Sequence, residues 1–179
     1  MGLKRSVQQL FGGKRMAALE PGATAPAISL KDTDGKTASL AEALKKGPVV
    51  AAFFKVSCPV CQFAFPFLER LHEMYGGPGL TLFGISQDEA RDTRDFMKEF
   101  GVKFPVLIDD RGYPASNHYG LTNVPSVFLI SPDGKIKTSS VGFSKADLES
   151  IAAQAARATG KPAKPLFRPG EVVPDYKPG

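Results

Sequence analysis

Tryptophan is absent from this chain of 179 residues, and cysteine and histidine occur only twice each. The scarcity of cysteine and histidine bears on metal binding, because a structural zinc site needs four ligands. The only candidates of these two types are Cys58, Cys61, His72 and His118, and no Cys/His spacing pattern surrounds the histidines. A zinc site is therefore not expected, and the sequence assigns no metal ligand.

Long hydrophobic runs are also missing. No stretch of about 18 or more apolar residues occurs, so no membrane-spanning helix is expected. Residues 1–19 carry lysine and arginine but no apolar run before a small-residue cleavage site, which argues against a secretory signal. With no export signal and a single cysteine pair, the sequence predicts a cytoplasmic protein, or an extracytoplasmic one if a signal lies upstream of this sequence.

The excess of positive charge lies at the two ends of the chain. Of the net charge of +5, residues 1–20 contribute +3 and residues 160–179 contribute +2, while residues 21–159 are neutral. Nucleic-acid binding needs basic residues clustered on one face of a domain, so no nucleic-acid partner is expected. We predict three parts: a basic leader (1–20), one domain (21–160) and a basic tail (161–179).

The predicted tail is rich in proline. Proline fixes φ and removes a backbone donor, so this segment is expected to be extended and neither helix nor central strand. Leu166, Phe167 and Tyr176 are candidate anchors if the tail lies over the domain.

Apolar runs and helical periodicity alternate within residues 21–160. Asp-Thr-Asp-Gly at 32–35 is a turn signal between two short runs and predicts a β-hairpin. Short apolar runs after Pro or Gly predict buried strands, and apolar residues at helical spacing predict helices. Strands are expected at 49–54, 80–85, 124–130 and 136–140, and helices at 59–75, 90–100 and 144–160. The order predicts an α/β protein with a mixed sheet, helices on both faces and an N-terminal β-hairpin.

Both cysteines lie in Cys58-Pro59-Val60-Cys61, after a predicted buried strand and at the start of a helix. A helix N-terminus favours a thiolate, because its N–H groups are unpaired and its dipole is positive there. Cysteines in such CxxC sites serve as nucleophiles at neutral pH. Cys58 is predicted to be the exposed attacking thiol and Cys61 the resolving one. A structural disulfide and two inert buried thiols stay open as alternatives, although so short a loop stabilises little.

The stretch from Val49 to Leu71, with Pro66 five residues after the second cysteine, resembles the thioredoxin superfamily. The leading hairpin, residues 104–109 (Phe-Pro-Val-Leu-Ile-Asp) and residues 124–130 (Val-Pro-Ser-Val-Phe-Leu-Ile) resemble its redoxin branch. That branch comprises the alkyl hydroperoxide reductase/thiol-specific antioxidant family and related thiol–disulfide oxidoreductases. The resemblance covers about residues 21–158.

The resemblance implies a thioredoxin-like fold and a substrate site next to the cysteines. Pro125 is expected to be a cis-proline packed against the active-site disulfide, and Val124 to offer backbone hydrogen bonds to a bound substrate strand. Pro59 and Val60, between the cysteines, are expected to line the same site.

The chain departs from the family pattern at several positions. The buried aspartate that thioredoxins carry six residues before the first cysteine is Ala52 here, so the proton of Cys61 must leave by another route. The proline and threonine of peroxidatic redoxins are Ala51 and Lys55, and residues 121–124 hold no arginine. Lys55 is a candidate accessory residue that could supply positive charge, or else a solvated lysine at a strand end.

The sequence thus predicts a thiol–disulfide oxidoreductase that uses the dithiol of Cys58 and Cys61 on protein or small-molecule disulfides. It predicts no cofactor besides this redox-active disulfide. The expected partners are substrate disulfides or thiols and an external reductant or oxidant protein. Two alternatives stay open: a thiol peroxidase of the peroxiredoxin type, with Cys58 oxidised to a sulfenic acid, and a copper- or zinc-binding module of the same fold.

Overall fold

The computed structural model describes residues 17–179, so most of the predicted basic leader lies outside the described residues. The strands are β1 (Ser29–Lys31), β2 (Thr37–Ser39), β3 (Val49–Phe54), β4 (Thr81–Ser86), β5 (Val106–Ile108), β6 (Ser126–Ile130), β7 (Ile136–Val141), β8 (Phe143–Ser144) and β9 (Tyr176–Lys177). The helices are α1 (Leu40–Leu44), α2 (Pro59–Tyr75), α3 (Ala90–Glu99), α4 (Pro114–His118) and α5 (Lys145–Thr159).

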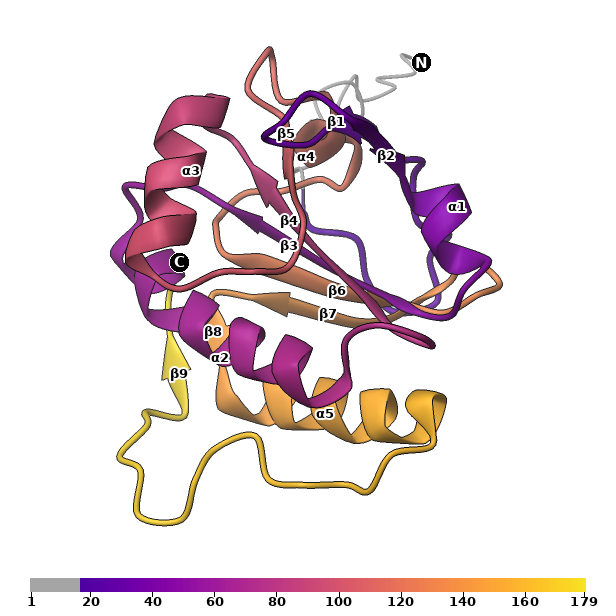
Figure 1. The fold of residues 1–179 in the computed structure, drawn as a ribbon, viewed down its shortest axis with the longest axis vertical. Helices are drawn as coiled ribbons and strands as arrows, with labels where there is room; N and C mark the ends of the chain where they lie inside the picture. Colours follow the sequence, from indigo (N-terminus) through magenta and orange to yellow (C-terminus); the bar gives the residue numbers. More distant parts are fainter. Residues whose placement is uncertain (1–16) are drawn as a thin grey trace, which may run out of the picture.

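A five-stranded sheet in the order β5-β4-β3-β6-β7 forms the centre of the molecule (Figure 1). β3 and β4 are parallel, as are β4 and β5, whereas β6 pairs antiparallel with both β3 and β7. The parallel pairs follow from the helical crossovers, and the antiparallel pair β6–β7 follows from the short turn between those strands. This is the mixed sheet predicted from the sequence.

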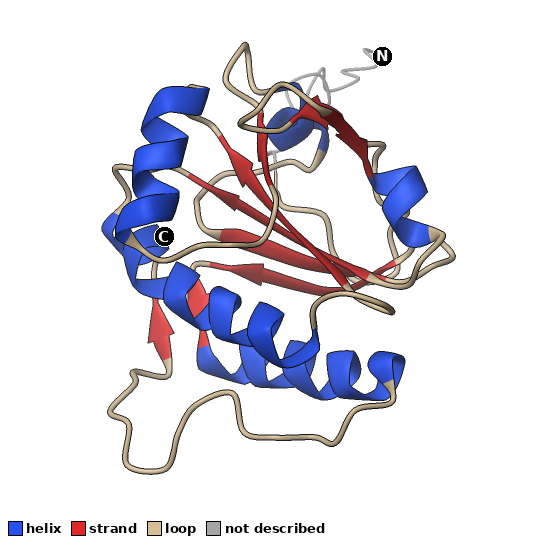
Figure 2. Cartoon of the chain, viewed as in Figure 1, coloured by secondary structure: helices blue, strands red, loops and turns tan. Residues whose placement is uncertain are grey.

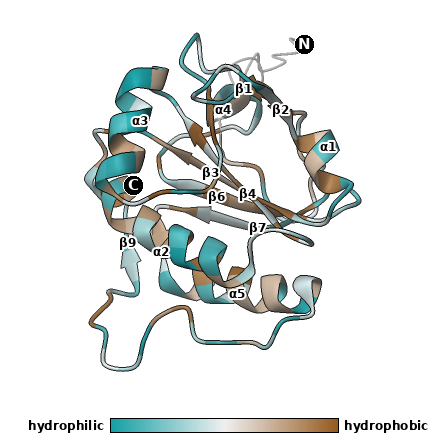
Figure 3. Ribbon diagram, in the orientation of Figure 1, coloured by the Kyte–Doolittle hydropathy of each residue, from teal (hydrophilic) through white to brown (hydrophobic). Residues whose placement is uncertain are grey.

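Helices cover both faces of this sheet, and the residues of β3 alternate between the two layers (Figure 2). Val50 and Phe54 join the core cluster formed with α2, α3 and α5. Val49 and Phe53 point the other way, into a second cluster with α1 and α4. The whole strand is buried, which explains its unbroken apolar sequence, and hydrophobic colouring is concentrated on the central strands (Figure 3).

The predicted N-terminal hairpin is present, with three residues in each strand. β1 and β2 pair antiparallel, and the Asp32 carboxylate accepts hydrogen bonds from the N–H groups of Asp34 and Lys36 in the turn. The second strand stops at Ser39, because the Ser39 hydroxyl accepts from the Glu42 N–H and caps the short helix α1.

Several short elements were not predicted: α1, α4, β5 and the small pair β8–β9. The strand predicted over 124–130 begins only at Ser126, since Pro125 has no N–H to donate. The long elements agree with the prediction to within a few residues. α5 is capped by the Ser144 hydroxyl, which accepts from the Asp147 N–H, and ends at Gly160 with φ 65°.

Residues 161–179, which we call the C-terminal strap, turn back after α5 and lead to β9, which lies beside β8 (Figure 1, yellow). Leu166 and Phe167 are buried, whereas Tyr176 is 55% exposed. β9 within the strap pairs antiparallel with β8, so the strap ends beside the central sheet.

Candidate active site

The two cysteines lie where the central strand β3 leads into helix α2. β3 ends at Phe54, and Cys58 is the N-cap residue of α2, with φ −82° and ψ 115°. Pro59 begins the helix, at a position where an N–H would have no partner within the helix. The Cys58 Sγ accepts a hydrogen bond from the Cys61 N–H at 3.3 Å. A sulfur atom therefore occupies the capping position that a serine or aspartate oxygen usually takes.

The two thiols differ in exposure. Cys61 is fully buried, whereas Cys58 is partly exposed, and both are free. Burial is the main cause that raises the pKa of the Cys61 thiol, and its hydrogen bond to Cys58 and the negative charge of Asp88 add to the rise. Cys61 thus keeps its proton at neutral pH, and a substrate can reach Cys58 first.

The loop before β6 lies directly against Cys58. The Cys58 thiol donates to the backbone oxygen of Val124 at 3.4 Å, and the Val124–Pro125 peptide bond is cis, as the resemblance implies. The Ser126 hydroxyl donates to the Asn123 oxygen at 2.8 Å and holds the loop closed. The structure therefore brings Cys58 next to Val124 and Pro125, although Cys58 and Val124 are 66 residues apart in the chain.

Pro59 and Val60 differ in their surroundings. Pro59 is exposed at the start of α2, and Val60 is half-buried and packs against the large core cluster. Phe63, one turn further along α2, packs edge-to-face against Phe143 with ring centroids 5.0 Å apart. The surface beside Cys58 is thus apolar on the α2 side.

Asp88 is a residue of this site that the sequence reasoning missed. Its carboxylate accepts a hydrogen bond of 2.8 Å from the Val56 N–H, in the loop that leads to Cys58. The Gln62 side chain donates to the Val56 oxygen at 2.9 Å, so both polar groups of the Val56 backbone are paired. Asp88 follows β4, the parallel neighbour of β3. An acidic residue just after the adjacent parallel strand was the signal available in the sequence, because the carboxyl ends of parallel strands meet at one edge of the sheet.

Lys55 lines a polar hollow next to the Val124 loop. The hollow has a volume of about 330 Å³, and its other lining residues are Gln87, Tyr113, Ser116, Asn117, Leu121, Thr122, Asn123 and Val124. The Lys55 ammonium lies 5.6 Å from the centre of the Tyr113 ring. Ala51 and Ala52 are buried within β3, so neither position offers a polar side chain to the site.

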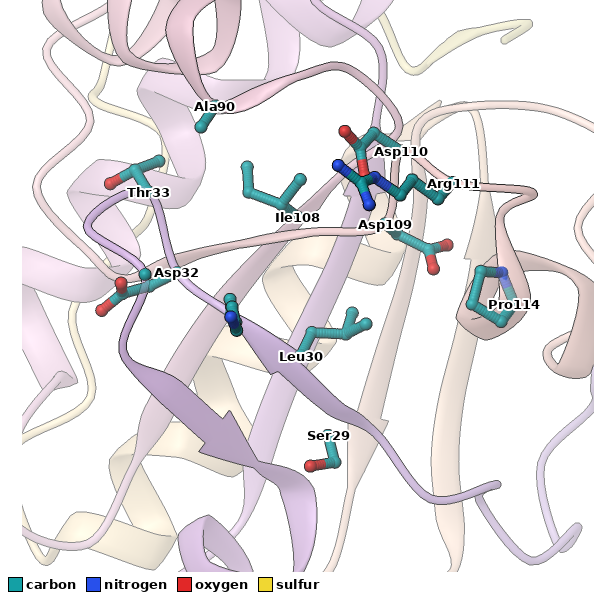
Figure 4. Close-up of a pocket in the computed structure, with 12 residues that line it drawn as sticks. Ser29, Leu30, Asp32, Thr33, Ala90, Ile108, Asp109, Asp110, Arg111 and Pro114 are labelled. Carbon is teal, nitrogen blue, oxygen red and sulfur yellow. The ribbon is translucent and has the colours of Figure 1, made fainter.

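A larger cavity, about 590 Å³, lies away from the two cysteines (Figure 4). It is lined by the N-terminal hairpin and by the segment that follows β5, including Asp109, Asp110 and Arg111. The Asp109 carboxylate accepts hydrogen bonds from the Ala115 and Ser116 N–H groups at the start of α4, so its role is to hold that turn.

Within the described residues, neither His72 nor His118 belongs to a cluster of metal-binding side chains with the cysteines. Among residues 17–179 no group of three or more His, Cys, Asp or Glu side chains could hold a metal ion. His72 packs against Phe104 with ring centroids 5.9 Å apart, and His118 is the last residue of α4. In this part of the chain, Cys58 and Cys61 therefore have no further protein ligands beside them.

Comparison with known proteins places this fold and site in a family. The model of the AhpC/TSA family matches residues 21–139, about two thirds of the chain. The chain belongs to the AhpC/TSA family. The AhpC/TSA match stops before α5 and the C-terminal strap, so those parts of the chain lie beyond it.

Relatives of this AhpC/TSA chain carry thiol–disulfide oxidoreductase names. The chain is 32% identical over 129 residues to thiol-disulfide oxidoreductase ResA of Bacillus subtilis, covering 71% of this chain and 69% of the relative. A solved structure of a thioredoxin-family thiol:disulfide interchange protein from Chlorobium tepidum is 30% identical, with a TM-score of 0.63 and coverage of 78% and 99%. The peroxidoxin BcpB of Mycobacterium tuberculosis matches with a TM-score of 0.64 at 22% identity, covering 79% and 97%, which shows the fold alone.

These findings confirm the predicted fold and the predicted enzyme class. The chain is a redoxin-branch member of the thioredoxin superfamily and an oxidoreductase of the thiol–disulfide class. None of the helices over residues 17–179 is long and apolar enough to cross a membrane. Neither this observation nor the names of the relatives favour the predicted cytoplasmic location over an extracytoplasmic one.

Proposed function

We propose that this enzyme exchanges thiols and disulfides through Cys58 and Cys61, on protein or small-molecule disulfides. One observation carries the proposal: the partly exposed Cys58 sulfur lies between the Cys61 N–H and the Val124 oxygen, while the Cys61 thiol is buried behind it. An outer thiol that a substrate reaches and an inner thiol that only the outer one reaches are what a two-step exchange requires.

In the reducing direction, the Cys58 thiolate attacks one sulfur of the substrate disulfide. A Cys58–substrate mixed disulfide forms, and the other substrate sulfur leaves as a thiolate that takes up a proton. Cys61 then loses its proton and attacks the Cys58 sulfur, which releases the second substrate thiol. The substrate gains two electrons and two protons, and the enzyme retains a Cys58–Cys61 disulfide.

The different surroundings of the two thiols determine which one attacks first. Burial keeps the Cys61 thiol protonated in the resting dithiol. The Cys61 N–H, in contrast, points to the Cys58 sulfur at 3.3 Å and stabilises negative charge there. The same pair of residues therefore favours Cys58 as the attacking group.

Val124, Pro125, Pro59 and Val60 form the surroundings in which a substrate would bind. The Val124 oxygen lies within hydrogen-bond distance of the Cys58 sulfur, which supports a substrate site along the Val124–Pro125 loop. The redox-active disulfide is the only redox group that the proposed exchange needs, and an external reductant or oxidant protein completes the cycle.

Single-cysteine variants test the mechanism. Cys58→Ser is expected to abolish disulfide reduction, because the outer nucleophile is lost. Cys61→Ser is expected to accumulate a mixed disulfide with the substrate, visible by mass spectrometry under non-reducing conditions. Full activity in Cys58→Ser, or a mixed disulfide trapped on Cys61 in that variant, would overturn the proposal.

The reduction potential of the Cys58–Cys61 pair decides the direction of exchange. Equilibration with a glutathione or dithiothreitol buffer, followed by alkylation and mass spectrometry, measures it. A value near about −270 mV, as in thioredoxin, indicates a disulfide reductant, and a value near about −120 mV indicates an oxidant.

The two alternative functions have separate tests. A thiol peroxidase requires that peroxide oxidise Cys58 faster than a free thiol, and rapid-quench alkylation measures that rate. A copper- or zinc-binding module would retain the metal through purification under reducing conditions, which elemental analysis detects. Lys55, three residues before Cys58, could supply positive charge to a peroxide, and its ammonium lies 5.6 Å from the centre of the Tyr113 ring.

A further inference from the structure

The C-terminal strap follows helix α2 backwards, from its end to the turn that holds the cysteines. Near the end of α2 the Tyr75 hydroxyl donates to the Pro162 oxygen at 3.2 Å. One turn earlier, Arg70 donates to the Leu166 oxygen at 2.8 Å. Further back, Phe167 packs on Phe67 with ring centroids 5.0 Å apart. The strap therefore has a defined course and leads to the candidate active site.

The middle of the strap is firmly attached. Arg70 makes two hydrogen bonds to the carboxylate of Glu171, at 2.8 and 2.9 Å. Leu166 and Phe167 are buried, at 2% and 7% exposure. Such apolar burial, together with a bidentate ion pair, holds a segment that has no helix or sheet of its own over this stretch.

The last residues of the strap lie on the loop that faces Cys58. β9 pairs with β8 through the register Ser144↔Tyr176, and the Lys177 ammonium lies 5.0 Å from the centre of the Phe63 ring. The Asn123 side chain donates to the backbone oxygen of Gly179 at 3.1 Å.

Gly179 lies against the Val124 carbonyl, which also accepts the hydrogen bond from the Cys58 thiol. Its backbone passes so close to the Val124 oxygen that a side chain at position 179 would collide with it. The same side of Gly179 faces the Cα of Gly142, whose backbone N–H donates a hydrogen bond to the Pro125 oxygen at 2.8 Å. The strip of backbone formed by Val124, Pro125 and Gly142 is therefore covered by the end of the strap.

We infer that residues 176–179 close the strand-docking side of the Cys58 site, and that they thereby select small disulfides over disulfides in extended polypeptides. This inference rests on the proposed function. An extended peptide binds to a free strand edge or backbone strip through main-chain hydrogen bonds, and the strap occupies this space at Val124 and along β8.

A second approach to the Val124 loop remains open. The polar hollow beside Lys55 includes Val124, and the strap does not line it. Its volume, about 330 Å³, is within the range of small-molecule sites. A low-molecular-weight disulfide needs no main-chain pairing and can use this side.

The test compares two disulfides on the reduced full chain and on a variant that lacks residues 176–179. Hydroxyethyl disulfide serves as the small substrate and insulin as the polypeptide one, and quenched alkylation with mass spectrometry measures the rate constant for oxidation of the Cys58–Cys61 pair. Cutting after Asp175 keeps Leu166, Phe167 and Glu171, which anchor the strap.

The deletion is expected to raise the rate constant with insulin by about tenfold, the equivalent of two regained main-chain hydrogen bonds. The rate constant with hydroxyethyl disulfide is expected to change by less than about twofold, because that substrate makes no strand pairing. Gly179→Val, which displaces the end of the strap at full length, is expected to act in the same direction. Val172→Ala is the matched control, since that side chain is 98% exposed.

An unchanged insulin rate in both variants would overturn the inference. An equal rise with both substrates would also overturn it, since the strap would then shield Cys58 from every disulfide alike. If the full chain and both variants leave both disulfides unreduced, the proposed function itself fails, which is a different result from a failure of the strap alone.

Discussion

The carboxylate of Asp88 accepts a 2.8 Å hydrogen bond from the backbone N–H of Val56, two residues before Cys58. Asp88 is itself held in place, because its N–H donates to the Ser86 hydroxyl, and that hydroxyl is bonded to Thr93 of α3 at 2.7 Å. The position of the Cys58 loop thus depends on a residue that follows the neighbouring strand. Asp88 is a positioning residue in this arrangement, and its negative charge also acts on Cys61.

Asp88→Ala should slow disulfide reduction. Loss of the carboxylate leaves the Val56 N–H unpaired, and a cost near the lower end of about 1–3 kcal/mol for an unpaired buried group corresponds to about tenfold in rate. Asp88→Asn retains an acceptor oxygen and should keep most of the activity. Single-turnover reduction of hydroxyethyl disulfide measures both variants, and an equal loss in both would contradict a positioning role.

Cys61 should resist alkylation over a wide pH range. Burial raises the pKa of its thiol, so in the Cys58→Ser variant its reaction with iodoacetamide should stay slow up to alkaline pH. Removing a negative charge favours ionisation, so Asp88→Asn in the same background should lower the pH at which alkylation begins. Mass spectrometry over a pH series follows both reactions. The alkylation rate of Cys61 in Cys58→Ser is compared at pH 8 with that of Cys58 in Cys61→Ser. Similar rates for the two thiols would contradict the burial argument.

Phe167→Ala should destabilise the protein through loss of packing by the strap. The Phe167 ring packs on Phe67 and lies 6.1 Å from the ring of Phe143. Truncation of a buried phenylalanine to alanine costs about 3–5 kcal/mol, and the strap can detach locally, so we expect a loss of about 2–3 kcal/mol in the free energy of unfolding. Urea denaturation followed by circular dichroism measures it. Val172→Ala serves as the control and should change this free energy by less than about 0.5 kcal/mol.

The ion pair between Arg70 and Glu171 should stabilise the protein at neutral pH, and this stabilisation should be lost in strong acid. The hydrogen bond from Arg70, followed by that from the Arg168 N–H, lowers the pKa of Glu171 to about 2. The folded pKa lies below the unfolded value of about 4.3, so the contribution is complete above that value and is lost as the pH falls towards 2. The free energies of unfolding of the native chain and of Glu171→Gln, measured by urea denaturation, should therefore differ at pH 6, and this difference should shrink between pH 4 and pH 2.5. A difference that is constant with pH would show that this ion pair does not contribute.

The sequence indicated the long elements because each carries its own periodic signal. The unbroken apolar run of β3, the proline at the start of α2 and the glycine after α5 are local features. The short elements α1, α4 and β5 were missed, since helices and strands of a few residues form through tertiary packing rather than through their own propensity. The proximity of Cys58 and Cys61 was also a local feature, because only Pro59 and Val60 separate them at the start of one helix.

Residue types and spacing alone indicated a thioredoxin-like α/β protein with a pair of cysteines at the start of a helix. Only the tertiary structure showed that the Asp88 carboxylate accepts a hydrogen bond from Val56 in the loop before Cys58, and that Gly179 lies against Val124. The proline-rich strap shows the reason most clearly. Its sequence excludes a helix, which is a property of single residues, but its course along α2 depends on contacts with Tyr75, Arg70 and Phe67, about 90 to 100 residues away, which no local pattern encodes.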